Sequence, residues 1–233
     1  MLLEVCVDDA LGLAEAVAGG ADRVELCAAL GIGGLTPTPG LIEAAASSPV
    51  PVYPMIRPRP GSFVFDAAEL ATMRADIRFS RAAGLPGVVM GASLPDGRLD
   101  AAVLADLVAE AHGLDLTLHR CIDLAPDIDE AVETALSLGF RRILSSGGAT
   151  QAHLGLPRLR RMVALAAGRL TVMPGSGISP ATWPLLKDLG VTEVHASCAA
   201  PIPGGPDPLG FATGQERRTR RDLVHLLREA LDH

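Results

Sequence analysis

Eight short segments rich in β-forming residues alternate with helical segments along nearly the whole chain, and this alternation limits the possible folds most. The eight segments are residues 2–7, 23–26, 52–56, 87–90, 114–119, 142–145, 170–173 and 193–197. They divide 233 residues into units of about 29 residues, the usual size of a βα repeat in a (β/α)8 barrel. We therefore predict an α/β fold in which residues 1–233 form one TIM-type (β/α)8 barrel domain.

The two faces of the predicted strands distinguish this barrel from a doubly wound open sheet. The central strands of such a sheet are apolar on both faces, because helices cover each side. In segment 2–7, Leu3, Val5 and Val7 share one face, whereas Glu4 and Cys6 share the other. The second, fifth and last segments alternate in the same way. The pattern favours a barrel whose apolar faces meet the helices and whose polar faces point to the barrel axis.

The C-terminal region departs from this alternation. Residues 199–214 contain four prolines and four glycines, which suit neither a strand nor a helix. We predict a loop over the barrel mouth at about 199–214, followed by a C-terminal helix at about 216–231.

Composition excludes several classes of protein. A net charge of −7 and 3% aromatic residues provide neither the basic surface nor the stacking residues that nucleic-acid binding needs. No apolar run approaches the roughly 18 residues of a membrane span, and the N-terminus lacks the cationic start of a secretory signal. The cysteines Cys6, Cys27, Cys121 and Cys198 are widely spaced. We therefore expect reduced thiols in a cytoplasmic protein that binds neither nucleic acid nor membrane.

Some cofactors and mechanisms are not expected either. Lys187 is the only lysine and falls on the predicted seventh helix, outside the barrel, so Schiff-base chemistry is not expected. No GxGxxG motif follows the first strand and there is no P-loop, so neither NAD nor ATP is implied.

Polar residues gather at the carboxyl ends of the predicted strands, where barrels of this type place their active groups. They are Glu4, Cys6, Glu25, Cys27, Arg57, Arg59, His119, Arg120, Asp123, His195 and Ser197. Charges inside a barrel cost several kcal/mol each unless they are paired. These groups therefore either form a site or neutralise one another within the barrel. In an enzyme, Glu25, His119 or Asp123 would transfer protons.

Two glycine-rich strand ends suggest an anion site. Residues 145–148 read Ser-Ser-Gly-Gly and residues 175–177 read Gly-Ser-Gly. Glycine lets backbone amides approach an anion, and barrels often hold a substrate phosphate near this corner. Tight turns that require glycine explain the same pattern equally well. The substrate-binding residues predicted for an enzyme are Glu4, Arg57, Ser146, Gly147, Gly175, Gly177 and His195.

Two of the cysteines suggest a metal site. Cys6 and Cys27 have the same inward parity near the ends of consecutive strands. If these strands are neighbours, their backbones lie about 4.8 Å apart, so both sulfurs can reach one ion. Two soft thiolates favour Cu(I). The alternative is that both side chains are simply small buried hydrophobic groups, as free cysteines often are.

At these residues the sequence resembles the copper homeostasis protein CutC family, up to about Ala199. The shared motifs, in order along the chain, are Leu3-Glu4-Val5-Cys6, Ala21-Asp22-Arg23-Val24-Glu25-Leu26-Cys27, Gly33-Gly34-Leu35-Thr36-Pro37, Met55-Ile56-Arg57-Pro58-Arg59, His119-Arg120 with Asp123, Ser145-Ser146-Gly147, Gly175-Ser176-Gly177 and Val194-His195. The resemblance implies a TIM-type barrel, a cytoplasmic location, self-association and a role in copper handling through Cu(I) binding. It implies no established reaction.

Transferred residue by residue, the resemblance makes Cys6 and Cys27 the metal ligands. It also makes Glu4, Glu25, Arg57, His119, Asp123 and His195 residues of a small-molecule pocket at the barrel mouth. The sequence departs from the family pattern where Ser62 replaces an acid, where Cys121 and Ile122 replace an alanine and a phenylalanine, and where Ala196 replaces a serine. Val64 stands where some members have another cysteine.

Three hypotheses follow. The leading one is a Cu(I)-binding barrel that buffers or transports copper, in a protein that forms homo-oligomers. The second is an enzyme that acts on a small phosphorylated or carboxylated metabolite by acid/base chemistry. The third is a structural protein whose polar interior only fixes the barrel register.

Overall fold

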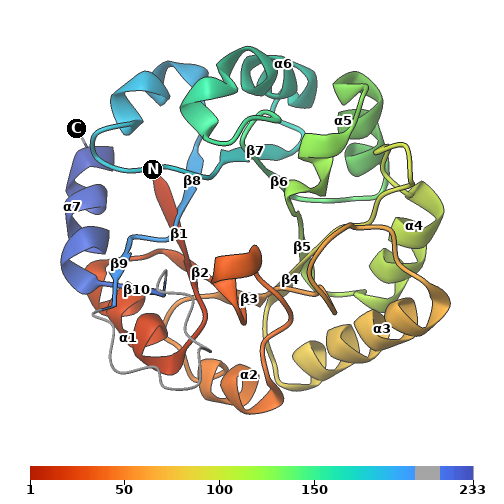
Figure 1. The fold of residues 1–233 in the computed structure, drawn as a ribbon, viewed down its shortest axis with the longest axis horizontal. Coiled ribbons are helices and arrows are strands. Elements are labelled where there is room, and N and C mark those ends of the chain that lie inside the picture. Colours follow the sequence, from red (N-terminus) through yellow and green to blue (C-terminus); the bar gives the residue numbers. More distant parts are fainter. Residues whose placement is uncertain (203–215, 233) are drawn as a thin grey trace, which may run out of the picture.

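The computed structural model describes residues 1–202 and 216–232, and Figure 1 views it down the axis of a ring of strands surrounded by helices. The parallel strands are β1 (Leu2–Val7), β2 (Arg23–Leu26), β3 (Val52–Pro54), β4 (Gly87–Met90), β5 (Asp115–Leu118), β6 (Arg142–Ser145), β7 (Thr171–Pro174) and β8 (Glu193–Ala196). The α-helices are α1 (Ala10–Gly19), α2 (Pro39–Ala45), α3 (Ala67–Ala82), α4 (Ala101–Glu110), α5 (Ile128–Ser137), α6 (Leu156–Ala166) and α7 (Arg221–Leu231). No helix in these two ranges is long and apolar enough to cross a bilayer.

The strands form two parallel sheets of four, which together make the barrel wall. Their orders are β3-β2-β1-β8 and β4-β5-β6-β7. A parallel bridge between Met55 and Val89 joins the two sheets, and the Ile56 amide donates to the Val89 carbonyl at 2.7 Å. On the other side, β7 lies beside β8 (Figure 1). This arrangement confirms the predicted TIM-type (β/α)8 fold.

The strand faces follow the parity of the sequence. Leu3, Val5 and Val7 are fully or almost fully buried in the apolar layer between the strands and the helices. Glu4 and Cys6, on the opposite face, are buried inside the barrel. Polar and apolar residues therefore alternate because each strand separates two different environments.

The helices begin where acidic residues can cap them. Asp66 forms a capping box with Glu69 at the start of α3. Asp100 and Asp127 accept hydrogen bonds from backbone amides at the starts of α4 and α5. Between β7 and β8, short 3-10 turns at Trp183–Leu185 and Lys187–Leu189 replace an α-helix. Lys187 therefore lies on a 3-10 turn rather than on the α-helix that the sequence suggested.

The C-terminal region differs from its prediction. Residues 199–201 are not loop but strand β9 (Ala199–Pro201), which pairs antiparallel with β10 (Arg217–Thr219). Because residues 217–219 pair with β9, helix α7 begins at Arg221 rather than at about residue 216. Residues 203–214 of the predicted loop lie outside the described residues.

A network of buried charges fills the base of the barrel. Arg23 pairs with Glu4 and with Glu193. Arg142 pairs with Glu193 at 3.3 Å and with Asp115 at 2.8 Å. Tyr53 completes the network. Its hydroxyl donates to Asp115 at 2.7 Å, and the guanidinium groups of Arg23 and Arg142 lie over its ring. We call these six residues the base network. It spans strands of both sheets, so it links the two halves of the barrel.

Replacing Arg23 by methionine is expected to lower the free energy of unfolding by about 3–5 kcal/mol, because Glu4 and Glu193 would lose the cation that they share. Urea unfolding followed by circular dichroism measures this change. The matched control is Arg98→Met, since Arg98 forms an exposed ion pair with Asp96 and its loss should change stability by less than about 1 kcal/mol. Equal effects of the two substitutions would contradict the proposed importance of the base network.

Candidate functional site

The carboxyl ends of the strands surround a pocket of about 350 Å³, which we call the mouth pocket. Many of the residues singled out from the sequence line it, namely Cys6, Glu25, Arg57, His119, Arg120, Gly177, His195 and Ser197. Apolar side chains form the rest of its wall, including Met55, Phe63, Leu144 and Ile178. Without the three-dimensional fold, these apolar side chains cannot be distinguished from core residues.

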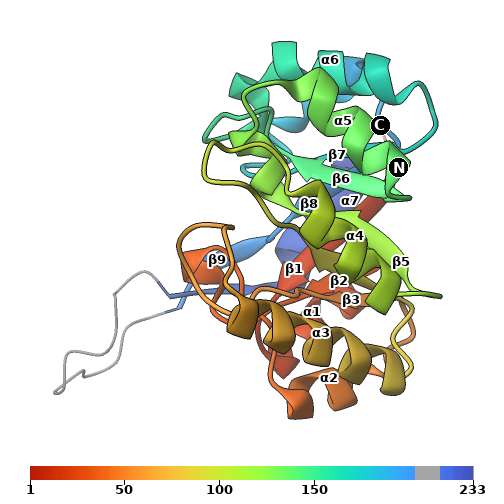
Figure 2. The same ribbon diagram turned by 90° about the vertical axis from the view of Figure 1, so that its right-hand side faces the viewer.

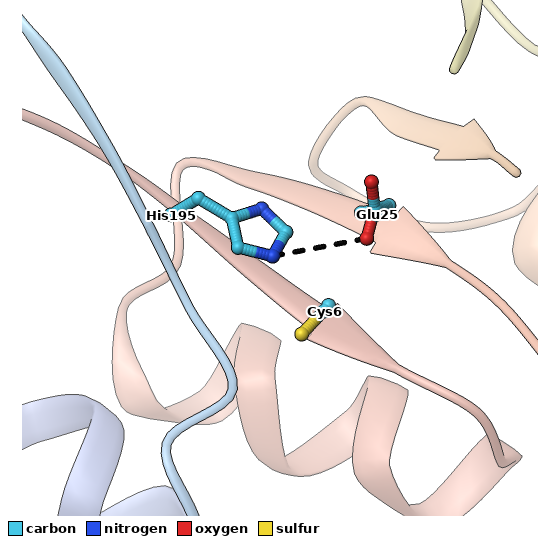
Figure 3. Close-up of side chains that lie close together, drawn as sticks. All are labelled: Cys6, Glu25 and His195. Carbon is cyan, nitrogen blue, oxygen red and sulfur yellow. Dashed lines mark ion pairs between the residues drawn. The ribbon is translucent and has the colours of Figure 1, made fainter. Parts of the chain in front are cut away.

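Cys6, Glu25 and His195 form a compact cluster at this mouth (Figure 3). One ligand atom from each residue lies within 4.8 Å of the other two. The strand register explains this meeting, because Cys6 lies beside Glu25 on β2 and Glu4 lies beside His195 on β8. All three side chains are buried. Thiolate, imidazole and carboxylate are all metal ligands, so the cluster can hold an ion.

The imidazole of His195 is fixed between two carboxylates. Its Nδ1 lies 2.8 Å from Oε1 of Glu4, and its Nε2 lies 3.8 Å from Oε2 of Glu25. Burial alone would lower the pKa of His195, but the negative charges of Cys6 and Glu25 and the hydrogen bond to Glu4 raise it well above its usual value. Burial likewise opposes ionisation of Glu4, yet Arg23 and His195 lower its pKa to about 2.

Glu25 has one engaged oxygen and one free oxygen. The Cys27 thiol donates to Oε2 at 3.5 Å, whereas Oε1 has no hydrogen-bond partner among the described residues. Burial raises the pKa of Glu25, and the nearby charge of Glu4 adds to that shift, while His195 opposes it. Glu25 therefore lines the mouth pocket with an Oε1 atom that no other described residue uses as a hydrogen-bond acceptor.

Cys27 lies one step further along the barrel than Cys6. The Cys27 amide donates to the carbonyl of Val7. Cys27 therefore lies level with a part of the chain that follows Cys6, and not beside Cys6 itself. Its thiol is fully buried beside Gly34, and burial together with Glu25 raises its pKa well above the usual value. Sequence parity placed both thiols on the inner face, but it carried no information about this register. A shared ion between Cys6 and Cys27 remains a prediction.

The Ser-Ser-Gly-Gly turn after β6 binds a carboxylate of the protein itself. Asp123 accepts hydrogen bonds from the Ser146 and Gly148 amides at 3.0–3.2 Å, and from the Ser145 hydroxyl at 2.5 Å. The Ser146 hydroxyl also donates to Asp123, and the Gly147 amide donates to Ser145. In this structure, the Ser146 and Gly148 amides, which the sequence assigned to a substrate anion, are engaged by Asp123, which itself pairs with Arg120.

The glycines after β7 have different structural roles. A Cβ at Gly175 would lie 2.5 Å from a Leu144 methyl group and 3.3 Å from His195, so this position needs glycine for close packing. Gly177 lines the mouth pocket and has a φ of +76°, a conformation that favours glycine. Ser176, between them, has the same positive φ, which is strained for a residue with a side chain.

His119 and Arg57 line another part of the wall, where both contact the Phe63 ring. The ring centroids of Phe63 and His119 are 4.7 Å apart, and the Arg57 guanidinium lies 5.0 Å from the Phe63 centroid. Burial and the charge of Arg57 lower the pKa of His119 to about 3, so its imidazole stays neutral. Arg57 donates to the backbone carbonyls of Ile32, Gly34 and Gly61 at 2.9–3.3 Å.

Comparison with known proteins identifies the family. A model described as the CutC family matches residues 1–200. The chain belongs to the CutC family. This result confirms the resemblance that the sequence motifs indicated.

Relatives and solved structures agree with this membership. A CutC family protein of Sinorhizobium medicae is 56% identical over 236 residues, which cover 100% of this chain and 96% of that relative. A human copper homeostasis protein cutC homolog is 42% identical over 198 residues, which cover 84% of this chain and 72% of that relative. The crystal structure of a CutC from Streptococcus agalactiae superposes with a TM-score of 0.80 at 28% identity, covering 84% of this chain and 98% of that one.

Other barrels share only the fold with this CutC family member. A thiamine phosphate pyrophosphorylase from Pyrococcus furiosus superposes with a TM-score of 0.60 at 15% identity, covering 99% of this chain and 95% of that one. At this level of identity the similarity carries no information about chemistry.

Asp123→Asn is expected to lower the free energy of unfolding by about 2 kcal/mol at pH 7, because the charged acceptor of the 145–148 turn is lost. Burial opposes ionisation of Asp123, but hydrogen bonds from Ser145, Ser146 and Arg120 lower its pKa below 3.8. A lowered pKa stabilises the fold above the unfolded-state value, and this stability is lost as the pH falls through the folded-state value.

The difference between wild type and Asp123→Asn should therefore shrink as the pH falls from 7 towards 2, as urea unfolding at each pH would show. Asp106→Asn, on the exposed face of α4, is the control and should change stability by less than about 0.5 kcal/mol. A difference that stays constant down to the lowest pH would contradict the assigned role of the Asp123 charge.

Proposed function

We propose that this CutC family chain takes part in copper homeostasis by binding Cu(I) at the mouth pocket, with Cys6 as the central ligand. The observation that carries the proposal is the cluster of Cys6, Glu25 and His195, whose ligand atoms lie within 4.8 Å of one another. The names of relatives support the metal, since both the human relative and the Streptococcus agalactiae structure are described as copper homeostasis proteins.

The chemistry of the available donor atoms indicates which residues bind Cu(I). Cu(I) prefers soft sulfur and accepts imidazole nitrogen, whereas carboxylate oxygen is a hard donor. We therefore propose Cys6 and Cys27 as the sulfur ligands and His195 as the nitrogen ligand, which releases its Nε2 proton to solvent when the metal binds, with Glu25 beside the ion. Cys27 meets this requirement if its thiol turns from Glu25 towards Cys6, whose charge already contributes to the raised pKa of Cys27. A bound metal ion deprotonates a coordinating thiol, so burial of Cys27 does not prevent ligation.

The proposal also covers the cellular location and the self-association of the protein. All four cysteines are free thiols, which suits a reducing compartment, so we propose a cytoplasmic location. Self-association is proposed on the family resemblance, and sedimentation velocity at several concentrations would measure it directly.

Anaerobic titration with Cu(I) in competition with a colorimetric Cu(I) chelator tests the ligand assignment. Wild-type protein should remove one equivalent of Cu(I) from the chelator. Cys6→Ser and Cys27→Ser should each weaken Cu(I) binding by on the order of 100-fold, because each loses a soft ligand. Circular dichroism of each variant checks that the fold is kept.

Cys121→Ser is the matched control, because Cys121 is also fully buried but lies on the turn after β5, whereas Cys6 lies on β1 and Cys27 directly follows the neighbouring strand β2. Its affinity for Cu(I) should equal that of wild type within about threefold. Unchanged Cu(I) affinity in the double variant Cys6→Ser/Cys27→Ser would refute the proposal. Tighter binding of Zn²⁺ than of Cu(I), with loss in Glu25→Gln, would assign the cluster to a harder ion.

A further inference from the structure

The mouth pocket is far larger than a metal ion needs. Its volume of about 350 Å³ falls in the range of small-molecule sites, and its wall combines apolar side chains with a few polar groups. The cluster of Cys6, Glu25 and His195 accounts for only one part of this wall. The part formed by Arg57, Phe63 and His119 lies outside this cluster.

His119 presents a hydrogen-bond donor that the described protein residues do not use. Its Nδ1 accepts the backbone amide of Cys121 at 3.1 Å, so Nδ1 carries no proton and the neutral ring has its proton on Nε2. This Nε2–H group is buried and has no hydrogen-bond partner among the described residues. The side chain of His119 is only 3% exposed and lines the mouth pocket. An unpaired buried donor costs about 1–3 kcal/mol, which a ligand oxygen would recover.

Arg57 presents a positive charge without a negative partner. Its three hydrogen bonds reach backbone carbonyl oxygens, and no carboxylate of the described residues forms an ion pair with it. Its Nε–H group is buried and also has no partner in the described part of the chain. Arg57 is 5% exposed, and a buried cation of this kind is costly unless an anion compensates for it.

The two residues lie close to each other in the wall of the mouth pocket. Both contact the Phe63 ring, and the charge of Arg57 adds to the effect of burial in lowering the pKa of His119. Their remaining polar atoms are held by backbone groups, so their free donors are fixed in place without a ligand. Asp123 already occupies the Ser146 and Gly148 amides of the turn where the sequence predicted an anion site, so the unpaired donors of His119 and Arg57 are the better candidates among the described residues.

We propose that the mouth pocket also binds a small organic molecule carrying an oxoanion, whose oxygens accept hydrogen bonds from His119 Nε2 and Arg57 Nε. The carbon skeleton of the ligand packs against Phe63 and the other apolar side chains of the pocket. The oxoanion is either a carboxylate or a phosphate, which offer the same acceptor oxygens. This proposal is independent of copper binding, because it uses none of the proposed metal ligands.

Binding is tested on full-length protein freed of metal by a chelating resin, in Tris chloride without soluble chelators, because these are themselves carboxylates. The probes are malate and benzoate as carboxylates, glycerol 3-phosphate as a phosphate ester, inorganic phosphate, and glycerol as the neutral control. Each is titrated to about ten times the upper end of the usual KM range. Calorimetry measures affinity, and ¹⁵N–¹H imidazole spectra of the wild type show which histidines respond.

At least one organic oxoanion should bind and shift the Nε2–H signal of His119, while the signal of the exposed His225 stays unchanged. His119→Phe keeps the ring against Phe63 but removes the donor, so affinity should fall at least tenfold. His225→Phe is the control and should bind as wild type does. The imidazole spectra need no substitution, so they remain decisive if His119→Phe does not fold.

The probe that binds identifies the class of ligand, since malate or benzoate indicates a carboxylate and glycerol 3-phosphate indicates a phosphate ester. The proposal is overturned if no organic oxoanion binds, if only inorganic phosphate binds, or if the His119 signal does not move. Equal affinity in a folded His119→Phe variant overturns it as well. None of these outcomes depends on Cu(I), so they are separate from failure of the copper proposal.

Discussion

The carboxylate of Glu4 connects the stability of this barrel with its candidate site. One of its oxygens pairs with Arg23 in the base network, and the other lies 2.8 Å from Nδ1 of His195. The cation below keeps Glu4 ionised although it is completely buried, and the ionised carboxylate in turn orients the imidazole above it. His195 can therefore present Nε2 to the mouth pocket only because the ion pairs of the barrel base are complete. Figure 2 shows β1 and β8, which carry these two residues, running together through the barrel.

Much of this organisation was predictable from the sequence, because alternation along a strand has a simple physical origin. Each inner strand separates an apolar helix layer from a polar axis, so the parity of Glu4 and Cys6 against Leu3 and Val5 was sufficient to place them. The relative positions of these side chains along the barrel axis were not predictable. Parallel strands can slide by two residues without changing any face, and only the folded register shows that Cys6 meets Glu25 while Cys27 lies further along.

The 145–148 turn shows a second limit of sequence reasoning. Serines and glycines at a strand end have the same composition whether their donors bind a ligand or a side chain of the protein. Here Asp123, from the turn after β5, supplies the anion. The distinction depends on a contact between residues more than 20 positions apart, which no local pattern encodes. The start of α7 has a similar cause, since the pairing of β10 with β9 overrides the helical tendency of the preceding arginines.

The mouth pocket is built so that its polar groups are fixed from behind. His195 is held by Glu4, His119 by the Cys121 amide, and Arg57 by three backbone carbonyls. His119 and Arg57 thereby each retain one N–H donor that no other described residue uses, and the Nε2 of His195 faces only Glu25 at 3.8 Å. Groups fixed in this way lose little entropy when a ligand arrives, so binding energy is not spent on ordering them. The two sets of groups differ in character, because sulfur and imidazole suit a soft cation whereas two N–H donors suit an anion. The mouth pocket can then hold a cation at one part of its wall and an oxoanion at another, because neither ligand uses the groups that bind the other.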